Sequence, residues 1–186
     1  MLQLTINSLK AAVTMAATKD ARYYLNGVFV GVMEDGAVHL RATDGNVAFE
    51  DVMPNKCEGQ KGPFSIIIPL DAAKAAAKTK GFVVELSTLP DGKYQIGNTV
   101  FSPIDGLFPD MDRIFARRDK SFDNVVAHYD FELLARCQTA MRLATGGKNT
   151  FYRIQNSPVG LVCRENATFP RCAVRPLRPD GCFIDT

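Results

Sequence analysis

Residues 64–81, FSIIIPLDAAKAAAKTKG, decide the fold because they join an apolar strand directly to an alanine-rich helix. The run over 64–68 has the length of a buried strand, and Asp71 is a residue type that caps helix N-termini. A glycine just after a run of helix-forming residues is a common stop signal. We therefore predict a strand over 64–68 and a helix over 72–80 that Gly81 ends.

The same order of strand, helix and three short strands occurs twice more along the chain. The other opening strands are predicted over 2–6 and 124–129, and the other helices over 8–19 (cap Asn7 or Ser8) and 131–145 (cap Asp130). The short strands are predicted over 22–32, 37–42, 47–53, 82–87, 94–96, 99–102, 150–155, 160–164 and 167–174. This repeat predicts an α+β fold of strand–helix–strand–strand–strand units, with the helices on one face of antiparallel sheet.

Two segments break the repeat. Residues 54–63 are polar and contain glycine, as expected of a loop that crosses between the first two copies. Residues 103–121 are rich in Pro, Asp and Arg and show little periodicity, which is typical of a connector between domains.

The overall composition is that of a folded protein: 46% of the 186 residues are hydrophobic and 23% are charged. There is no apolar run near the roughly 20 residues of a membrane span and no secretory signal pattern, so we expect a cytoplasmic protein. Its five cysteines are scattered without a C-x-x-C pair, and we expect free thiols in a reducing compartment.

Basic residues are concentrated in the predicted helices. Segments 8–19, 71–80 and 130–146 together carry a net charge of +4, whereas the rest of the chain carries −2. If the helices share one surface, that surface suits a phosphate backbone; the alternative is ordinary solvation of exposed helix faces. Lys74 and Lys78, one turn apart without an acidic partner at i±4, favour phosphate binding.

A catalytic function has little support in the sequence. The only histidines are His39 and His128, neither with the spacing of metal ligands, and there is no glycine-rich phosphate loop. The pairs Asp44-Gly45 and Asp91-Gly92 have the pattern of turns. We therefore expect a protein that is not an enzyme and that needs no metal or other cofactor.

Four short segments resemble, in the same order, segments of the bacterial DNA polymerase III β subunit, the sliding clamp. They are DARYYLNGV at 20–28, ATDG at 42–45, DGLFPD at 105–110 and VRPLR at 174–178. The first carries most of the resemblance, because it is similar to the opening of the clamp's middle domain. The resemblance covers nearly the whole chain, although unevenly.

This resemblance implies the DNA-clamp fold and a division into domains. Residues 1–110 resemble a complete clamp domain of two repeats, 111–121 a connector, and 122–186 half of a clamp domain with a C-terminal tail. Full β subunits have three domains and close as a dimer around duplex DNA. The chain thus resembles a shortened relative of this family.

The resemblance further implies a polymerase processivity factor that binds double-stranded DNA without sequence specificity. Basic side chains of the helices, and Lys19 in the loop before the 22–32 strand, would face the phosphates. The predicted DNA-binding residues are Lys10, Lys19, Lys74, Lys78, Lys80, Arg136 and Arg142.

A second implied site is the groove in which clamps bind short peptides of DNA polymerase and other partners. The matching residues are Leu25, Thr43, Gly45, Asn46, Val47, Pro109, Arg113, Ile114, Arg175, Pro176, Leu177 and Arg178. The family has His-Arg-Leu where this chain has residues 46–48, and an apolar Met where it has Arg175, so we expect an altered partner preference. For Leu25, Val47 and Leu177 ordinary core packing is the alternative.

The sequence leaves one alternative function open, which is a clamp-fold binding module or regulator that does not encircle DNA.

The third copy lacks a partner half, and its sheet edge and helix face would be costly to expose. We therefore expect a homo-oligomer, a dimer or a tetramer, in which two third copies build a shared domain.

Overall fold

The first two copies exchange their opening strands and so form one unit. The computed structural model describes residues 1–33, 36–53, 64–115, 128–147, 152–155, 160–164 and 169–177. The first copy consists of β1 (Leu2–Thr5), α1 (Ile6–Met15), the short 3-10 helix η1 (Tyr23–Leu25), β2 (Gly27–Val32), β3 (Val38–Thr43) and β4 (Val47–Met53). The second consists of β5 (Phe64–Pro69), α2 (Leu70–Ala77), β6 (Val83–Thr88), β7 (Tyr94–Ile96) and β8 (Thr99–Phe101). Strand β1 pairs with β6 and β5 pairs with β2, so each copy completes the other's sheet.

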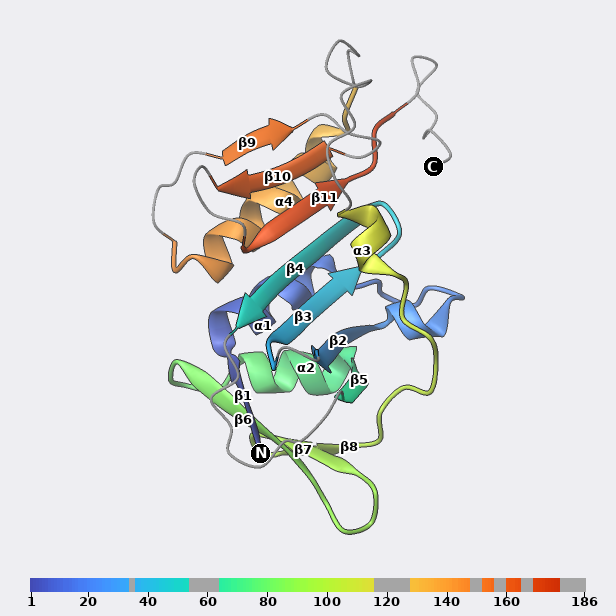
Figure 1. Ribbon diagram of the computed structural model, residues 1–186, viewed down its shortest axis with the longest axis vertical. Coiled ribbons are helices and arrows are strands. Elements are labelled where there is room, and N and C mark those ends of the chain that lie inside the picture. The colour runs from blue at the N-terminus through green and yellow to red at the C-terminus, as the bar shows by residue number, and fades with distance from the viewer. Residues whose placement is uncertain are drawn as a thin grey trace.

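The third copy extends one of the two sheets. It consists of α4 (Phe131–Ala144), β9 (Tyr152–Gln155), β10 (Gly160–Arg164) and β11 (Arg171–Val174). Strand β11 pairs antiparallel with β4, in a register that places Arg171 opposite Glu50 and Val174 opposite Val47. The result is a seven-stranded sheet in the order β5-β2-β3-β4-β11-β10-β9, beside a four-stranded sheet in the order β1-β6-β7-β8 (Figure 1).

The main helices α1, α2 and α4 lie on the same side of the seven-stranded sheet, with α1 in contact with both others (Figure 1). Small buried residues of α1 and α2, such as Ala12 and Ala73, let the helices approach closely. From α4, Cys137 and Met141 enter the same hydrophobic core as Leu9 of α1. The repeated α+β architecture with helices on one face of antiparallel sheet is therefore confirmed. In the described part of the chain no helix is long and apolar enough to span a bilayer.

The first helix differs from its prediction at both ends. It begins at Ile6, with Thr5 rather than Asn7 or Ser8 in the cap position, and it ends at Met15 rather than near Lys19. Ser8 is unavailable as a cap because it is buried and donates a hydrogen bond to Asp51 Oδ2 at 2.5 Å. Burial raises the pKa of the Asp51 carboxyl above its ordinary value, and the hydrogen bond from Ser8 acts in the opposite direction. The helix ends at Met15 because the backbone of Ala16 is in the extended conformation.

Two other elements also start at positions other than those predicted. Helix α2 begins at Leu70, so Asp71 lies in its first turn and does not cap it, and it ends at Ala77, three residues before the end predicted from Gly81. The strand predicted over 22–32 begins only at Gly27, because η1 occupies residues 23–25. Asp130 does cap α4 as predicted, since its carboxylate accepts a hydrogen bond from the Glu132 amide at 2.7 Å.

Several predicted features lie outside the described residues. These are the loop 54–63, most of the strand predicted over 124–129 and the tail from 178 onward. Of that strand, the structure shows an isolated antiparallel bridge between His128 and Leu177. The division into a two-repeat domain, a connector and a half domain stays a prediction.

The described part of the segment predicted to be a connector, residues 103–115, packs onto the outer face of the sheet. Residues 103–115 cross that face and include the short helix α3 (Met111–Ile114), which Asp110 caps. Met111 and Phe108 form a second hydrophobic cluster with residues of three strands, which leaves the side opposite the main helices partly covered (Figure 1). The aromatic ring of Phe108 stacks on Phe29 with 5.1 Å between centroids. The sequence lacked a helical period here because α3 has only four residues.

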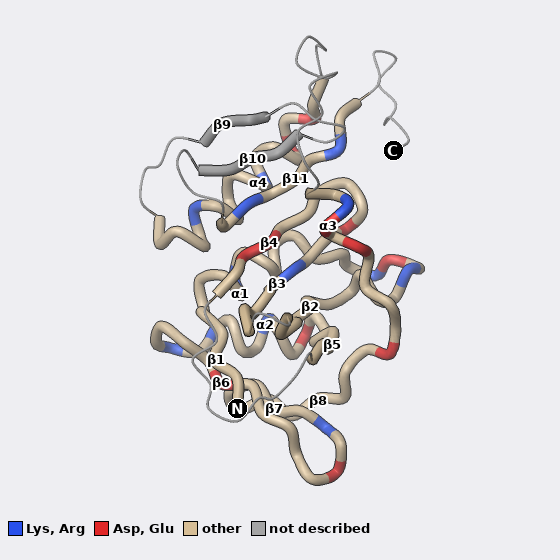
Figure 2. The backbone as a smooth tube through the Cα atoms, in the orientation of Figure 1, with Lys and Arg blue, Asp and Glu red and all other residues tan. Residues whose placement is uncertain are grey.

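A buried carboxylate on β4 joins the third copy to the first. Glu50 has no exposed surface, and it accepts hydrogen bonds from Arg41 Nε at 2.6 Å and from Arg171 Nη2 at 2.5 Å. His39 Nδ1 lies 3.0 Å from the same carboxylate. Figure 2 shows the basic positions of β3 and β11 on either side of the acidic position of β4. Arg171 also stacks on the ring of Phe115, 4.2 Å from its centroid.

Burial and the basic neighbours of Glu50 shift the pKa of its carboxyl in opposite directions. Burial by itself would raise the pKa of this carboxyl, but the His39 hydrogen bond and the positive charges of Arg41 and Arg171 outweigh it. The resulting pKa is about 2, below the ordinary value of 4.5. Glu50 is therefore ionised at neutral pH, as its two arginine partners require.

Replacing Glu50 by Gln should lower the free energy of unfolding by about 3 kcal/mol or more at neutral pH, because two arginines then lose their counter-charge in a buried site. Chemical denaturation measures this change. Asp91→Asn is the matched control, because the Asp91–Lys93 pair is exposed on both sides and its loss should change little.

The stability difference caused by Glu50→Gln should also depend on pH, in a direction that the lowered pKa of Glu50 determines. Since folding lowers the pKa of Glu50, its contribution is complete above about pH 4.5 and is lost as the pH falls towards 2. The difference in stability between Glu50→Gln and the original chain should therefore narrow over that interval. A constant difference across the interval would contradict the role assigned to this carboxylate.

Candidate functional site

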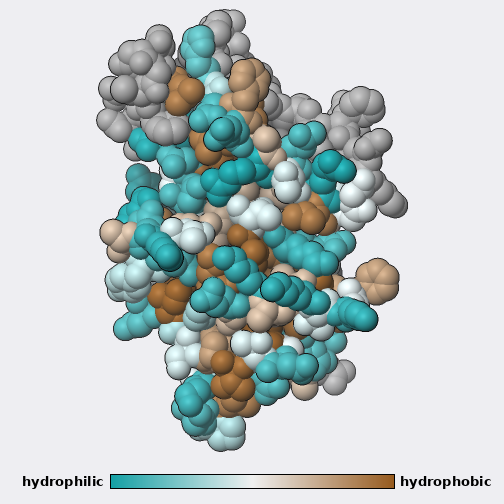
Figure 3. All heavy atoms as spheres, turned by 180° about the vertical axis from the view of Figure 1, so that it is seen from behind, coloured by the Kyte–Doolittle hydropathy of each residue, from teal (hydrophilic) through white to brown (hydrophobic). Residues whose placement is uncertain are grey.

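Most predicted DNA-contacting residues lie on the face of the molecule that carries the main helices. Lys10 on α1 and Arg142 on α4 line one hollow of about 380 Å³ between the two helices. Lys74 is exposed on α2, and Lys78 and Lys80 are exposed just beyond its last residue. In the part of the chain that the structure describes, none of these five forms an ion pair. Seen from this side, hydrophilic residues cover much of the surface and are interrupted by hydrophobic patches (Figure 3).

The remaining two predicted contacts differ from these five. Lys19 is exposed in the loop after α1, where its backbone has a φ of 58°. Arg136 on α4 is engaged within the fold, because its Nη1 lies 2.5 Å from Asp44 Oδ2 and its Nη2 donates to the Thr14 carbonyl at 3.2 Å. The geometry gives Arg136 a structural role that sequence alone did not indicate.

The predicted peptide groove corresponds to a hollow of about 210 Å³ in which four separate segments meet. It lies at the end of the β4–β11 seam, beside the turn between β3 and β4. The predicted groove residues that line it are Leu25, Thr43, Gly45, Asn46, Val47, Pro109, Ile114 and Arg175. We refer to this hollow as the seam groove.

Four predicted groove residues do not line the seam groove. Arg113 is exposed on α3, next to the lining residue Ile114. Pro176 is buried and Leu177 half-buried, directly after Arg175, and Arg178 is outside the described residues. The lining residues that the prediction missed are Arg22, Tyr24, Ala48, Ala173 and Val174. Arg22 and Tyr24 belong to the 20–28 segment, and the pairing of Ala48 with Ala173 required knowledge of the seam.

The turn that forms one wall of the seam groove is held by its own polar side chains. Thr43 Oγ1 donates to the Val47 carbonyl at 2.7 Å and accepts from the Gly45 amide at 3.0 Å. Asp44 Oδ1 accepts from the Asn46 and Val47 amides at 2.8 and 3.0 Å. Gly45 has a φ of 92°, which disfavours any residue with a side chain. The turn is thus fixed before any ligand binds.

Two arginines attach this turn to its surroundings. Arg22 Nη2 donates to the Asp44 carbonyl at 3.1 Å, and its guanidinium lies so close to Gly45 that a Cβ there would be 2.9 Å from it. Arg22 also pairs with Asp20 at 2.8 Å, and its hydrogen bonds bring the pKa of that carboxyl down to about 2. From the other side, Arg136 holds the Asp44 carboxylate. Because Arg136 lies on α4, the third copy helps to position the groove.

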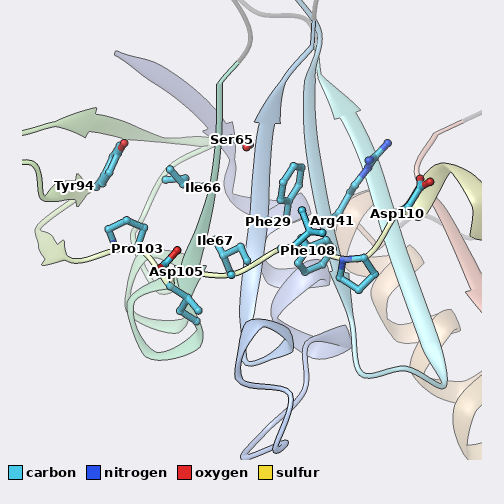
Figure 4. A pocket seen from close by; sticks show the side chains of 14 residues that line it. Phe29, Arg41, Ser65, Ile66, Ile67, Tyr94, Pro103, Asp105, Phe108 and Asp110 are labelled. Carbon is cyan, nitrogen blue, oxygen red and sulfur yellow. The ribbon is translucent and has the colours of Figure 1, made fainter.

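A larger hollow lies on the outer face, beneath the segment 103–110 (Figure 4). Its volume is about 660 Å³, and it shares Pro109 with the seam groove. Figure 4 shows Phe29 and Phe108 side by side, with Arg41 on the neighbouring strand. Arg41 is engaged by Glu50 and by Asp112, whose Oδ1 is 2.7 Å from Arg41 Nη2. Among the described residues no cluster of three or more His, Cys, Asp or Glu side chains could hold a metal ion.

No protein-family model matches the chain. It is 34% identical over 110 residues to the beta sliding clamp of Caulobacter vibrioides, in strain NA1000 and in strain ATCC 19089 alike. The aligned part covers 54% of this chain and 29% of the relative. The chain therefore spans less than a third of the length of the curated relatives that it matches.

Solved structures of sliding clamps resemble the chain over almost all of its length. The DNA polymerase III subunit beta of Borrelia burgdorferi matches with a TM-score of 0.69 and 15% identity, covering 95% of this chain and 64% of that one. For the sliding clamp of Pseudomonas aeruginosa the TM-score is 0.67, with 15% identity and coverage of 95% and 66%. For the Caulobacter crescentus clamp the TM-score is 0.61, with 22% identity and coverage of 95% and 65%. The expected resemblance is thus confirmed: this chain has the DNA-clamp fold of the bacterial polymerase III β subunits.

Proposed function

We propose that this chain is a sliding-clamp-like processivity factor that binds duplex DNA without reading its sequence. The observation that carries the proposal is the β4–β11 seam, which places α4 beside α1 and brings Lys10 and Arg142 into one hollow. Unpaired basic side chains from several helices on one face suit a phosphate backbone, whose contacts carry no sequence information. The similarity to beta sliding clamps supports the same function.

The second half of the proposal is that the seam groove tethers partner proteins by short peptides, including one from a DNA polymerase. A partly apolar hollow with a preformed wall is a suitable receptor for the anchor side chains of an extended peptide. Leu25, Val47 and Ile114 provide the apolar part of the lining. None of the residues that line the groove is one of the exposed lysines on or after α2.

An alternative function is a clamp-fold regulator that binds clamp-binding partners but does not encircle DNA. The engagement of Arg136 by Asp44 favours it, since that contact leaves α4 with fewer basic groups for phosphate. Retention on DNA separates the two functions. A ring stays on closed circular DNA and slides off linear DNA, whereas a regulator shows no such difference.

Assembly with further copies of the chain is part of the proposal. The edge strands of the two described sheets are β1 and β8 in one and β5 and β9 in the other, and β8 and β9 lie at opposite ends of the molecule (Figure 1). Val100 on β8 and Val83 on β6 are about half exposed, and Phe131 at the start of α4 is 86% exposed. Unpaired edges and exposed apolar side chains of this kind are usually covered.

We expect a homodimer or homotetramer in solution, because a monomer would leave the edge strands β8 and β9 in water. Light scattering coupled to gel filtration measures the mass directly. A mass of 20.4 kDa at micromolar concentration, the mass of one chain, would contradict this assembly. Val100→Lys should shift the equilibrium towards smaller species if β8 is an interface, whereas Lys93→Glu on the nearby turn should leave it unchanged.

The double substitution Lys74→Glu and Lys78→Glu should abolish or greatly weaken association with duplex DNA. Each phosphate contact contributes about 0.9 to the slope of log affinity against log salt, so the loss of two contacts lowers the slope by about two. Fluorescence anisotropy over a salt series measures this slope. Lys93→Glu is the control, because Lys93 lies on the β6–β7 turn and pairs with Asp91. Equal slopes for the double variant and the control would count against DNA binding by the helix face.

The two arginines of α4 provide a matched pair on one helix. Arg142→Gln should lower the salt slope by about one, because Arg142 is exposed on the helix face. Arg136→Gln should lower it much less and should instead loosen the Asp44 turn. The same anisotropy series measures both, and thermal unfolding reports the structural effect. A larger fall in the salt slope for Arg136→Gln than for Arg142→Gln would show that Arg136 binds phosphate despite its pair with Asp44.

A further inference from the structure

The large hollow on the outer face includes the free edge of a strand. Strand β5 is an edge strand of the seven-stranded sheet, and Ser65, Ile66 and Ile67 of this strand line the hollow of about 660 Å³. Segment 103–110 forms another wall, and Tyr94 of β7 lies at one end (Figure 4). We refer to this hollow as the outer hollow. It combines a sheet edge with a wall of side chains.

The main chain of Ser65 faces away from β2, on the free side of β5. The Ile67 carbonyl accepts a hydrogen bond from the Ile104 amide at 2.9 Å, so Ile67 faces that side too. Residues two apart in a strand face the same way, which gives Ser65 the same direction. Pro69, two residues beyond Ile67, has no amide hydrogen, as expected on an unpaired edge. Ser65 is exposed, and among the described residues its main chain has no hydrogen-bond partner outside the β2–β5 pair.

Aromatic side chains give the outer hollow an apolar lining. Phe29 and Phe108 are stacked with 5.1 Å between their centroids. Tyr94 is half-buried and is held by two aromatic neighbours, each with its centroid 6.0 Å away. Leu107, also in the lining, is 90% exposed. A preformed apolar surface beside a free sheet edge is the arrangement that receives an added strand and its alternate side chains.

The charged groups that the outer hollow offers to a ligand are acidic. Asp105 is exposed, and within the described part of the chain it forms no ion pair or hydrogen bond. Asp110 is exposed as well and uses its Oδ1 to cap α3. Arg41, the basic residue of the lining, is already held by Glu50 and Asp112. The charge of the lining therefore suits a cationic ligand and disfavours a nucleic acid.

We propose that the outer hollow binds an extended segment of a partner protein in which basic and apolar residues alternate, and that this segment adds to the β5 edge at Ser65. The exposed amide and carbonyl of Ser65 align the main chain of the segment. Its apolar side chains pack on Tyr94, and the stems of its basic side chains lie along Phe29. The carboxylates of Asp105 and Asp110 attract the basic groups. This site is separate from the helix face and does not rest on the function proposed for the seam groove.

The first test uses two labelled peptides, Gly-Lys-Val-Lys-Val-Lys-Gly and its counterpart with Glu in place of Lys, both blocked at their ends. Anisotropy with the full chain should show the Lys peptide binding about tenfold more tightly at low salt, and added salt should reduce this preference. Asp105→Asn and Asp110→Asn should each reduce the preference, and Asn can still cap α3. Asp71→Asn is the matched control, because Asp71 is an exposed acid on α2 and should leave the preference in place.

The second test addresses the main chain. Ser65→Pro removes the amide hydrogen on the free side of β5 and should weaken binding of the Lys peptide about tenfold. Ser65→Ala keeps that hydrogen and should bind the peptide as the original chain does. Unfolding curves verify that each variant is folded.

Equal binding by Ser65→Pro and Ser65→Ala would overturn the addition of a strand. Equal binding of the two peptides by the original chain, or a loss of preference in Asp71→Asn as large as in Asp105→Asn, would overturn the selection of basic segments. Failure of both peptides to bind would overturn the site. A lower solution mass for Ser65→Pro than for Ser65→Ala would overturn the proposed partner, because the occupant would then be a second copy of the chain.

Discussion

The pairing of β4 with β11 is the constraint on which the rest of this structure depends. It joins the third copy to a unit that is otherwise complete, and it does so around Glu50, a carboxylate with no exposed surface between Arg41 and Arg171. A buried charge of this kind adds little net stability compared with an apolar pair, but its loss is costly and wrong registers leave it unpaired. A shift of β11 by one residue would turn Arg171 to the opposite face of the sheet. The ionic contact therefore specifies the register more than it strengthens the sheet.

Both candidate sites follow from that register. On the helix side, the seam places α4 against α1, so that Lys10 and Arg142 border one hollow. At the end of the seam, it aligns Ala48 with Ala173 and brings Arg175 beside Asn46, which completes the groove. The Asp44 turn lies between the two sites, and Arg136 reaches it from α4. The third copy is thus a structural part of the groove as well as a source of basic side chains.

The sequence was a good guide where local patterns decide the structure and a poor one where distant contacts do. The strands of the second copy were predicted to within one residue at each end and its helix to within three, because the apolar strand, the alanine-rich helix and the Asp-Gly turn are local signals. The end of α1 was missed because residue 17 bonds to residue 25, a contact that no helical period reveals. The helix α3 was missed because a single capped turn held by Met111 in a hydrophobic cluster has no periodicity. Arg136 was grouped with the DNA-facing cations because charge is visible in a sequence, whereas a partner 92 positions away is not.

The difference between Arg136 and Arg142 shows why counting charges on a helix overstates a phosphate-binding surface. The two side chains are six residues apart on α4, and they project from different sides of it: one toward the Asp44 turn, the other toward Lys10. An arginine suits the first position because its planar group can bind a carboxylate and a carbonyl at once. Exposed lysines on and after α2 suit phosphate, since they are flexible point charges and need no fixed geometry. The arginines around the groove are held by hydrogen bonds, whereas the lysines on and after α2 are exposed, and this division suits the two ligands that we propose. A peptide has to be held in one register, whereas a sliding duplex has to be held in none.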